Sequence, residues 1–232
     1  IKQFHDEAME QVKEHAGLSE EKLKELTQKI YERHPSRVKA VFAGMEETSG
    51  VGLAALKFCD AVDTVAMAGE LGRAACSAVV AWGPYTGGGP LVFGRNFDYP
   101  EYFKEFNDTL AVVVFNPDDG SRSTATLVNA GQVSTKQSFN DRGLMLEIND
   151  GMGSGDLASP QNRMYTLIQP LTFMLDATNY ITLDAELQST LPHHATIFTA
   201  ADSREAFAYE ASTSEVRRRG GNDGLLVWPT TS

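Results

Sequence analysis

The chain has 232 residues, of which 42% are hydrophobic and 22% are charged, as in an ordinary globular protein. This length allows one large domain or two small ones, with a core that needs no disulfide or metal to hold it together. The formal net charge of -11 counts against nucleic acid as a partner, because phosphate binding requires a basic surface.

Basic residues and cysteines are sparse, and their spacing narrows the class of protein further. Arg217–Arg219 is the one basic run, and the glycines that follow it predict a solvated turn. Cys59 and Cys76 are too few for a disulfide framework and lie in no zinc-binding spacing, so we expect free thiols and no zinc site. We also expect no other metal and no cofactor.

No apolar run reaches the length that a membrane-spanning helix needs, and no signal peptide is visible. The sequence starts at Ile1 rather than Met, so we expect an upstream piece, which could carry an export signal. The localisation is therefore open between the cytoplasm and export to the periplasm or extracellular space. The oligomeric state is open as well, with a homo-oligomer among the alternatives.

The first part of the chain has a helical pattern. Helices are predicted over residues 3–15, over 19–33 with Ser19 as the N-cap, and after Pro35, where Ser36 can cap the next helix. Gly50 and Gly52 break this pattern before a short apolar helix over 53–59. The histidines of this part, His5, His15 and His34, are predicted to lie on the surface, and Cys59 in the core.

After residue 75 the apolar residues alternate, as in antiparallel strands with a turn at Asn140–Gly143. Strands are predicted over 76–82, 91–97, 109–115, 123–129, 133–139, 144–149, 195–200, 206–211 and 225–228. Two helical stretches, about 160–176 and 182–189, lie among these strands. This order predicts an α+β protein with helices packed on stacked antiparallel sheets.

The sharpest candidate for chemistry is Cys76, which has small residues on both sides at the change from helix to strand. A hairpin formed with the next strand would bring Arg95 and Asp98 close to it. Arg95 could stabilise a thiolate there, and Asp98 could orient a basic group. The alternative is a buried cysteine beside a structural ion pair.

These residues resemble a known family. Cys76-Ser77 followed by Gly94–Tyr99 resembles the start of the choloylglycine hydrolase and penicillin V acylase family. The turn at 140–144 with Glu147–Asn149 after it, and the order of 193–202 and 208–210, resemble later parts of that family. The stretch 44–51 resembles the pro-segments of the related isopenicillin N acyltransferases, acid ceramidase and N-acylethanolamine amidase.

The resemblance implies an N-terminal-nucleophile hydrolase with a four-layer αββα sandwich. Residues 1–75 would be a helical pro-segment, removed by self-cleavage before Cys76, and 76–232 the hydrolase domain. Cys76 would be the nucleophile and its freed α-amine the base, with Asp98 holding the amine and Arg95 favouring the thiolate or contacting substrate. Asn149, or the backbone N–H next to it, would stabilise the oxyanion. The expected substrate is a small N-acyl amide.

Other functions stay open beside this hydrolase. The same fold could transfer the acyl group from coenzyme A to an amine, or be a binding protein without the complete site. The family places a further Asn beyond the strand that ends near Trp228, so we expect the sequence to continue past Ser232.

The sequence also contains weaker patterns. A papain-like site would use Cys76, His193 or His194, and Asn222, but its local signatures are absent. The stretch 150–156 lacks the ligands of a calcium loop, and Gly87–Gly89 lacks those of a phosphate loop. The aromatic residues Trp82, Tyr85, Phe97 and Tyr99 could line an acyl pocket, although a place in the core is the commoner use.

Overall fold

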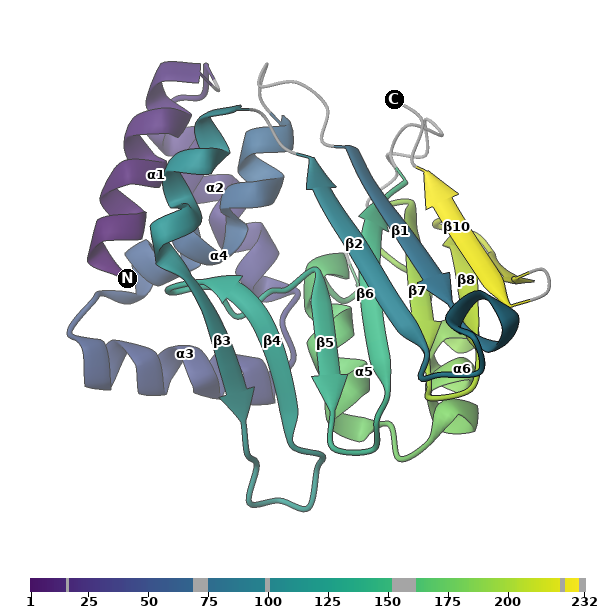
Figure 1. Ribbon diagram of the computed structural model, residues 1–232. Helices are drawn as coiled ribbons and strands as arrows, with labels where there is room; N and C mark the ends of the chain where they lie inside the picture. Colours follow the sequence, from purple (N-terminus) through teal and green to yellow (C-terminus); the bar gives the residue numbers. More distant parts are fainter. Residues whose placement is uncertain (16, 69–74, 99–100, 152–161, 222–223, 230–232) are drawn as a thin grey trace. The chain divides into compact units, whose positions relative to one another are not determined.

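The computed structural model describes residues 1–15, 17–68, 75–98, 101–151, 162–221 and 224–229. It has the predicted α+β class, with helices and two antiparallel sheets (Figure 1). The chain divides into two compact units, and both are discontinuous in sequence. The first contains 1–74, 99–112 and 127–135, and the second 75–98, 113–126 and 136–232. A pro-segment of residues 1–75 stays a prediction.

Helices form most of the first unit. They are α1 (Lys2–His15), α2 (Glu20–Glu32), α3 (Ser36–Ser49), α4 (Leu53–Ala68) and the 3-10 segment η2 (Glu101–Thr109). The Ser19 side chain accepts the N–H of Lys22, so the predicted N-cap of α2 is confirmed. The predicted Ser36 cap is wrong, because Pro35 takes the N-cap position of α3 and no side chain caps this end. Gly50, with φ of 67°, ends α3 in the left-handed conformation.

Helix α4 lies at the centre of the first unit's core and is longer than predicted. Its apolar side chains pack with those of α1 and α2, and Cys59 is fully buried, as predicted. The predicted helix ends at Cys59, before the charged residues Asp60 and Asp63. Both carboxylates are buried instead, each with hydrogen-bond partners, and the helix continues to Ala68.

A buried polar network joins the helices of the first unit to residues 133–134. The ring of His34, only 4% exposed, lies 2.8 Å from an oxygen of Asp60, so its predicted surface position is wrong. The Asp60 carboxylate also accepts the backbone N–H groups of Val133 and Ser134, at 2.7 and 2.6 Å, and the Ser134 hydroxyl at 2.8 Å. These bonds lower the pKa of Asp60, although burial opposes that shift as the largest single effect.

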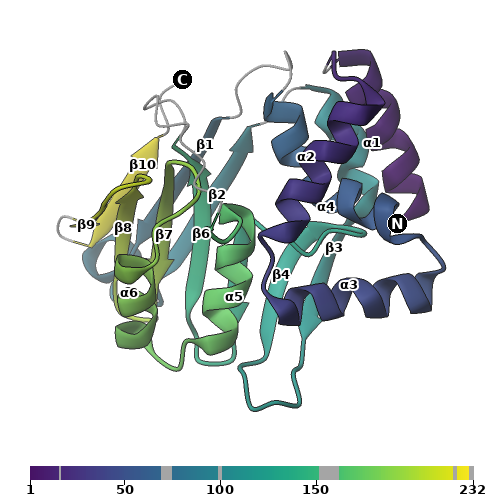
Figure 2. The same cartoon turned by 180° about the vertical axis from the view of Figure 1, so that it is seen from behind.

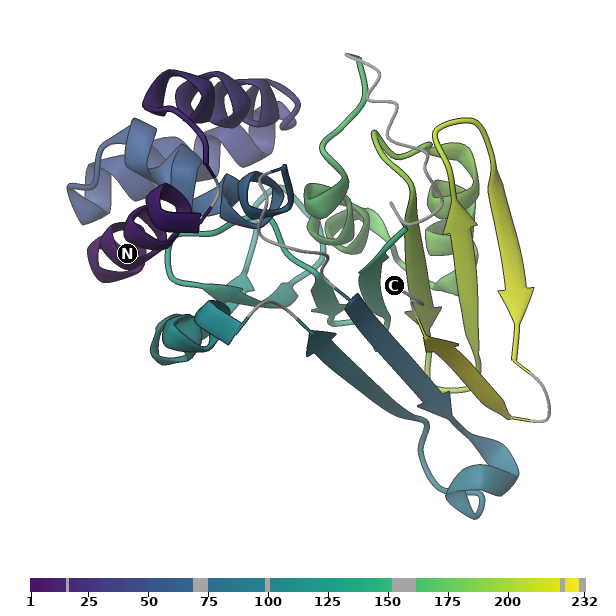
Figure 3. The ribbon, with the colours of Figure 1, turned by 90° about the horizontal axis from the view of Figure 1, so that it is seen from above.

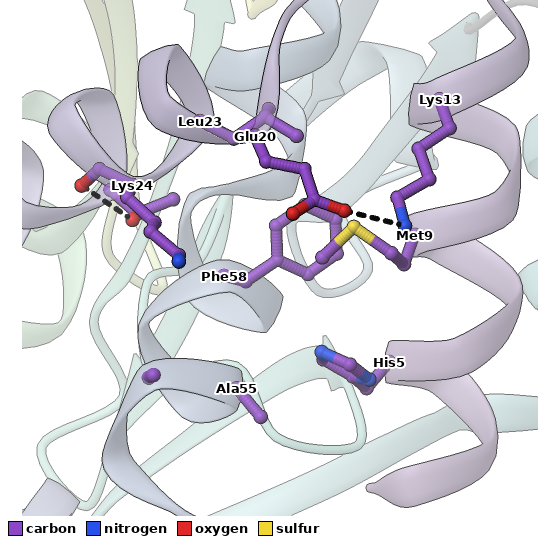
Figure 4. Close-up of a pocket in the computed structure, with 10 residues that line it drawn as sticks. His5, Met9, Lys13, Glu20, Leu23, Lys24, Ala55 and Phe58 are labelled. Atoms are coloured by element: carbon purple, nitrogen blue, oxygen red, sulfur yellow. Dashed lines mark hydrogen bonds and ion pairs between the residues drawn. The ribbon is translucent and has the colours of Figure 1, made fainter.

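The first unit also holds a cavity of about 400 Å³ between α1, α2 and α4 (Figure 4). Met9, Leu23 and Phe58 give it an apolar wall, and the ion pair of Lys13 with Glu20, 3.1 Å long, lies at its edge. None of the predicted catalytic residues lines it.

Two sheets and a helix pair build the second unit. The smaller sheet has the strand order β10-β1-β2, from Leu225–Pro229, Ala75–Ala81 and Val92–Asp98. The larger sheet runs in sequence order through β3 (Leu110–Phe115), β4 (Thr124–Asn129), β5 (Gln137–Asn140), β6 (Met145–Asp150), β7 (Thr196–Ala201), β8 (Ala206–Ala211) and β9 (Val216–Gly220), with parts of β3 and β4 in the first unit. The shorter segments are η1 (Gly83–Thr86), η4 (Thr166–Ile168), α5 (Gln169–Asp176) and α6 (Tyr180–Ser189).

The two sheets pack face to face in the second unit. Val80 of β1 and Leu226 of β10 meet the small residues Ala201, Ala206 and Ala208 of the larger sheet. Alanines on one face let the sheets approach closely, while larger side chains from the other fill the space. Helix α5 packs on β5 and β6, and α6 packs near β9, so helices cover the other face of the larger sheet (Figures 2 and 3). The predicted packing of helices on stacked antiparallel sheets is confirmed.

Three further predicted elements differ from the structure. The strand expected over 133–139 begins only at Gln137, because the backbone of 133–134 is bonded to Asp60. The helix expected over 160–176 forms as η4 and then α5 from Gln169, and its first two residues lie outside the described part of the chain.

The predicted solvated turn at the basic run is wrong, since Val216–Gly220 forms the edge strand β9, paired with β8. Its arginines are ion-paired: Arg217 with Glu215 at 2.8 Å, Arg218 with Asp184 at 3.0 Å and Arg219 with Glu210 at 3.1 Å. Charged side chains of this kind protect an exposed sheet edge from pairing with other chains. Consecutive like charges carry no periodic signal, so the strand was not visible in the sequence.

Candidate active site

Strands β1 and β2 place Cys76 and Arg95 on the same face of the smaller sheet. The two strands are antiparallel, with Cys76 opposite Phe97 and Ala78 opposite Arg95. Side chains alternate between the two faces of a strand, so Cys76, Arg95 and Phe97 all point to one face. This face is directed toward the larger sheet, where β1 contacts β6 (Figure 1). The hairpin that the sequence predicts therefore brings these residues together.

The Arg95 guanidinium binds three groups at once. Its Nη2 donates to the Cys76 sulfur at 3.3 Å and to the backbone carbonyl of Ile148 at 3.0 Å. Its Nε donates to a carboxylate oxygen of Glu147 at 2.9 Å, in an ion pair whose two side chains are 9% and 0% exposed. The guanidinium also lies 5.0 Å from the centre of the Phe97 ring. A fixed, forked cation of this kind is well suited to hold a sulfur anion.

Burial and charge act in opposite directions on the Cys76 thiol. Burial, the larger effect, raises the pKa of Cys76, while the nearby Arg95 cation and a hydrogen bond from the Asp98 backbone lower it. The Glu147 carboxylate adds to the rise. The net pKa lies above the usual value, so the thiol requires a base before it can act as a nucleophile at neutral pH.

Asn149 joins this cluster through Glu147. The Asn149 side chain is buried, and its Nδ2 donates to the second Glu147 oxygen at 2.9 Å. Its Oδ1 is also buried and has no hydrogen-bond partner among the described residues. Its backbone carbonyl accepts the Thr196 hydroxyl at 2.8 Å. The amide nitrogen has two N–H groups, and one of them is left for another acceptor.

Asp98 lies at the end of β2, opposite Ala75. Its side chain is exposed and accepts the Asn96 amide at 2.7 Å. Strand alternation places it on the other face of β2 from Arg95. Asp98 is thus beside the peptide that joins Ala75 to Cys76, rather than in the buried cluster of Arg95 and Glu147.

Glu147 is not among the site residues that the sequence predicts, although it lies in one of the segments that resemble the family. The signal was present, because it interrupts the apolar run of the strand over 144–149. A fully buried glutamate is rare unless it is paired. What the sequence did not show is its partner, since Arg95 precedes it by 52 residues.

The weaker alternatives gain no support from the described residues. The His193 ring accepts the backbone N–H of Thr166 at 2.9 Å, which gives it a structural role, and Asn222 lies outside the described part of the chain. Tyr85 and Phe97 are 59% and 40% exposed, whereas Trp82 packs on the core between the sheets. Tyr99, Ala74 and residues 152–156 are not among the described residues.

Metal sites and membrane-spanning helices are both absent from the described residues. These residues contain no group of three His, Cys, Asp or Glu side chains that could hold a metal ion. Among the helices of this part of the chain, none is both long and apolar enough to cross a membrane.

Comparison with known proteins gives structural likeness alone. No protein-family model and no curated protein matches the chain. Among solved structures, an N-acylethanolamine-hydrolyzing acid amidase ortholog from Caenorhabditis elegans matches 66% of this chain and 69% of its own, with 13% identity and a TM-score of 0.49. Two variants of the conjugated bile acid hydrolase from Clostridium perfringens match 65% of this chain with 12% identity and a TM-score of 0.44. The chain covers 52% of their length.

Proposed function

We propose that the protein is a self-processing cysteine hydrolase of the N-terminal-nucleophile class, which cleaves a linear N-acyl amide through an acyl-thioenzyme. The observation that carries this proposal is the Arg95 guanidinium, held 3.3 Å from the Cys76 sulfur at the start of β1. The motifs around Cys76, Arg95 and Asn149, which resemble those of the choloylglycine hydrolase family, support it.

The first reaction cuts the chain before Cys76. The thiol loses its proton to a water molecule and attacks the carbonyl carbon of Ala75. The acyl group moves from the Cys76 nitrogen to its sulfur, and the nitrogen takes up the proton. Water then hydrolyses this thioester, which leaves a carboxylate on Ala75, a thiol on Cys76 and a new α-amine on Cys76. Asp98, opposite Ala75 in the sheet, is the proposed partner of this amine once it is formed.

The second reaction uses the new amine as the base. An α-amine has a pKa of about 7.7–8.0, so near neutral pH a useful fraction can accept the proton of the thiol. The thiolate, held by Arg95, attacks the substrate carbonyl, and the amine gives the proton to the leaving nitrogen. A second water releases the acyl group from the sulfur. The Asn149 N–H that Glu147 does not use is the proposed donor to the oxyanion, and such donors typically contribute about 10²–10³ in rate.

Self-cleavage is tested by intact mass and N-terminal sequencing of freshly purified wild-type protein, Cys76→Ala and Cys59→Ala. We expect two wild-type fragments, one of which begins at Cys76, and a single uncut chain for Cys76→Ala. Cys59→Ala is the matched control, because Cys59 is a buried cysteine of the first unit and belongs to no part of the site. It should be cut as the wild type is.

A wild-type chain that stays whole for days at neutral and mildly acidic pH would contradict self-processing. The acyl-thioenzyme is tested separately, by incubating the cut protein with a panel of N-acyl amides and measuring the mass added to Cys76. Release of the acyl group to an amine instead of water would identify an acyltransferase.

A further inference from the structure

Glu147 occupies the centre of the buried cluster. It is fully buried on β6, and each of its two oxygens accepts one hydrogen bond. One bond comes from Arg95 at 2.9 Å and the other from the Asn149 amide at 2.9 Å. The same carboxylate therefore holds a side chain from the smaller sheet and one from its own strand.

The two bonds restrict how Arg95 can lie. The guanidinium is planar and rigid, so fixing its Nε on Glu147 also fixes the direction of its Nη2, which donates to the Cys76 sulfur. The Ile148 carbonyl, next to Glu147 in β6, accepts from the same Nη2 at 3.0 Å. Without the carboxylate, the buried cation would lose its counter-charge and one of these anchors.

The carboxylate also restricts how Asn149 can lie. An ionised carboxylate only accepts hydrogen bonds, so the Asn149 amide must turn its nitrogen, not its oxygen, toward Glu147. This explains why the buried Asn149 Oδ1 has no partner within the described residues. In this orientation the second N–H of the Asn149 amide stays available to donate to the oxyanion.

We infer that Glu147 is a positioning residue of the Cys76 site, whose carboxylate sets the orientation of Arg95 and Asn149 and whose charge offsets the effect of Arg95 on the thiol. The role in turnover rests on the proposed function. The coupling to the thiol does not, and it can be measured without any substrate.

The sign of that coupling follows from the charges. Arg95 and Lys136 favour the thiolate, and the Glu147 anion disfavours it. The two partners of the Arg95–Glu147 ion pair therefore act in opposite directions on the pKa of Cys76. Glu147→Gln keeps the size of the side chain and an acceptor for Arg95 but removes the negative charge. Cys76 should then lose its proton at a lower pH.

Glu147→Asp should have the opposite effect. It keeps the charge but withdraws the carboxylate by about 1.5 Å, one carbon–carbon bond, from Arg95. The guanidinium is then no longer held against the sulfur, and the thiolate loses its donor. A residue with a merely structural role would give no such pair of opposite changes.

The experiment is alkylation of the full chain with iodoacetamide over a series of pH values, followed by peptide mass mapping. Peptides that span Ala75–Cys76 and peptides that begin at Cys76 are scored separately, so that uncut and cut chains are never compared with each other. Cys59 reports unfolding within the same sample, because burial raises its pKa to about 12 and it should stay unmodified while the chain is folded.

At pH 7 we expect Glu147→Gln to react at Cys76 about threefold faster than the wild type, with its pH midpoint lowered. Thiolate fraction rises tenfold per unit of pKa, but nucleophilicity falls in part as the pKa falls. Glu147→Asp should react more slowly than the wild type. Asp60→Asn is the matched control, since it makes the same carboxylate-to-amide change in a buried ion pair of the first unit, and its Cys76 midpoint should not move.

A wild-type midpoint in Glu147→Gln, with Cys59 still protected, would overturn the inference. If Cys59 of that variant is modified, Glu147→Asp decides: slower alkylation supports the inference, and a wild-type rate overturns it. A lowered midpoint in a Glu147→Gln protein that never cuts itself would sustain the inference about Glu147 while removing the proposed self-processing, and a raised midpoint would overturn the inference.

Discussion

At the scale of single residues, the chemistry of the site depends on the shape of one cation. Arg95 is nearly buried and satisfies a carboxylate, a carbonyl and a sulfur from a single planar group. An ammonium carries the same charge but has no fork with which to bind all three in fixed directions. The charge alone is therefore not sufficient for this site.

This gives a prediction for Arg95→Lys. At least one of the buried acceptors, Glu147 or the Ile148 carbonyl, loses its donor, so the free energy of unfolding should fall by about 1–3 kcal/mol. Urea unfolding measures the change. Arg217→Lys is the matched control, because its ion pair with Glu215 is exposed, and it should change stability by less than about 0.5 kcal/mol. Equal stability of the wild type and Arg95→Lys would show that a lysine ammonium can replace the planar guanidinium here.

At the scale of elements, the turn between β5 and β6 fixes the strand that carries Glu147 and Asn149. The Asn140 Oδ1 accepts the N–H groups of Arg142 and Leu144, at 3.1 and 3.3 Å, and Gly143 takes φ of 73° to close the turn. The Asn140 Nδ2 donates to two carbonyls at the end of α5, those of Met174 and Ala177. One side chain thus closes the hairpin and caps the helix that packs on it.

Asn140→Asp should be strongly destabilising, although it barely changes the size of the side chain. A carboxylate oxygen would replace the Nδ2 that donates to the two α5 carbonyls. This oxygen would then face the two carbonyl oxygens, with no donor between the buried acceptors. We expect a loss of about 2–4 kcal/mol in thermal or urea unfolding. Asp141→Asn, the reverse change at the next and more exposed residue of the turn, should be nearly neutral. If the two variants melt alike, the turn does not depend on the Asn140 amide.

At the scale of the whole molecule, self-cleavage would leave the first unit built from both fragments. Residues 1–74 pack there with 99–112 and 127–135, which follow the cut in sequence. Phe4 lies edge-on to Phe106, with ring centres 5.3 Å apart, and Asp60 binds the backbone of Val133 and Ser134. These contacts do not depend on the peptide before Cys76.

We therefore expect the two fragments to elute together in size-exclusion chromatography at neutral pH. The pKa of Asp60 is lower in the folded protein than in the unfolded chain, where it is about 3.9. The Asp60 carboxylate therefore stabilises the folded state fully above about pH 3.9, and this stabilisation is lost as the pH falls through the pKa of the folded protein. The fragments should begin to separate below about pH 4, and Asp60→Asn should let them separate in less urea at neutral pH.

Glu25→Gln is the control for this prediction. The pKa of Glu25 is also lowered, to about 2, by Lys29 and Lys22, but its carboxylate lies on the surface of α2. Its loss should leave the fragments together. If the wild-type fragments separate at neutral pH, the bonds of Asp60 do not hold them together.

The sequence by itself determined the features that local bonding controls. The Ser19 cap, the turn at Asn140–Gly143 and the strand pair that carries Cys76 and Arg95 each depend on neighbouring residues or on strand alternation, and all three form as predicted. The resemblance drawn from the same residues supplied the roles of Asp98 and Asn149, which stay predictions.

Only the tertiary structure decided which charged groups are buried. His34 is predicted on the surface, and Asp60 and Glu147 have no predicted role, because the sequence does not show their partners. Asp60 meets a backbone 73 residues further along the chain, and Glu147 meets Arg95 across 52 residues. A buried charge is stable only beside its partner, and that partner is brought to it by the packing of distant elements, not by the local pattern of the chain.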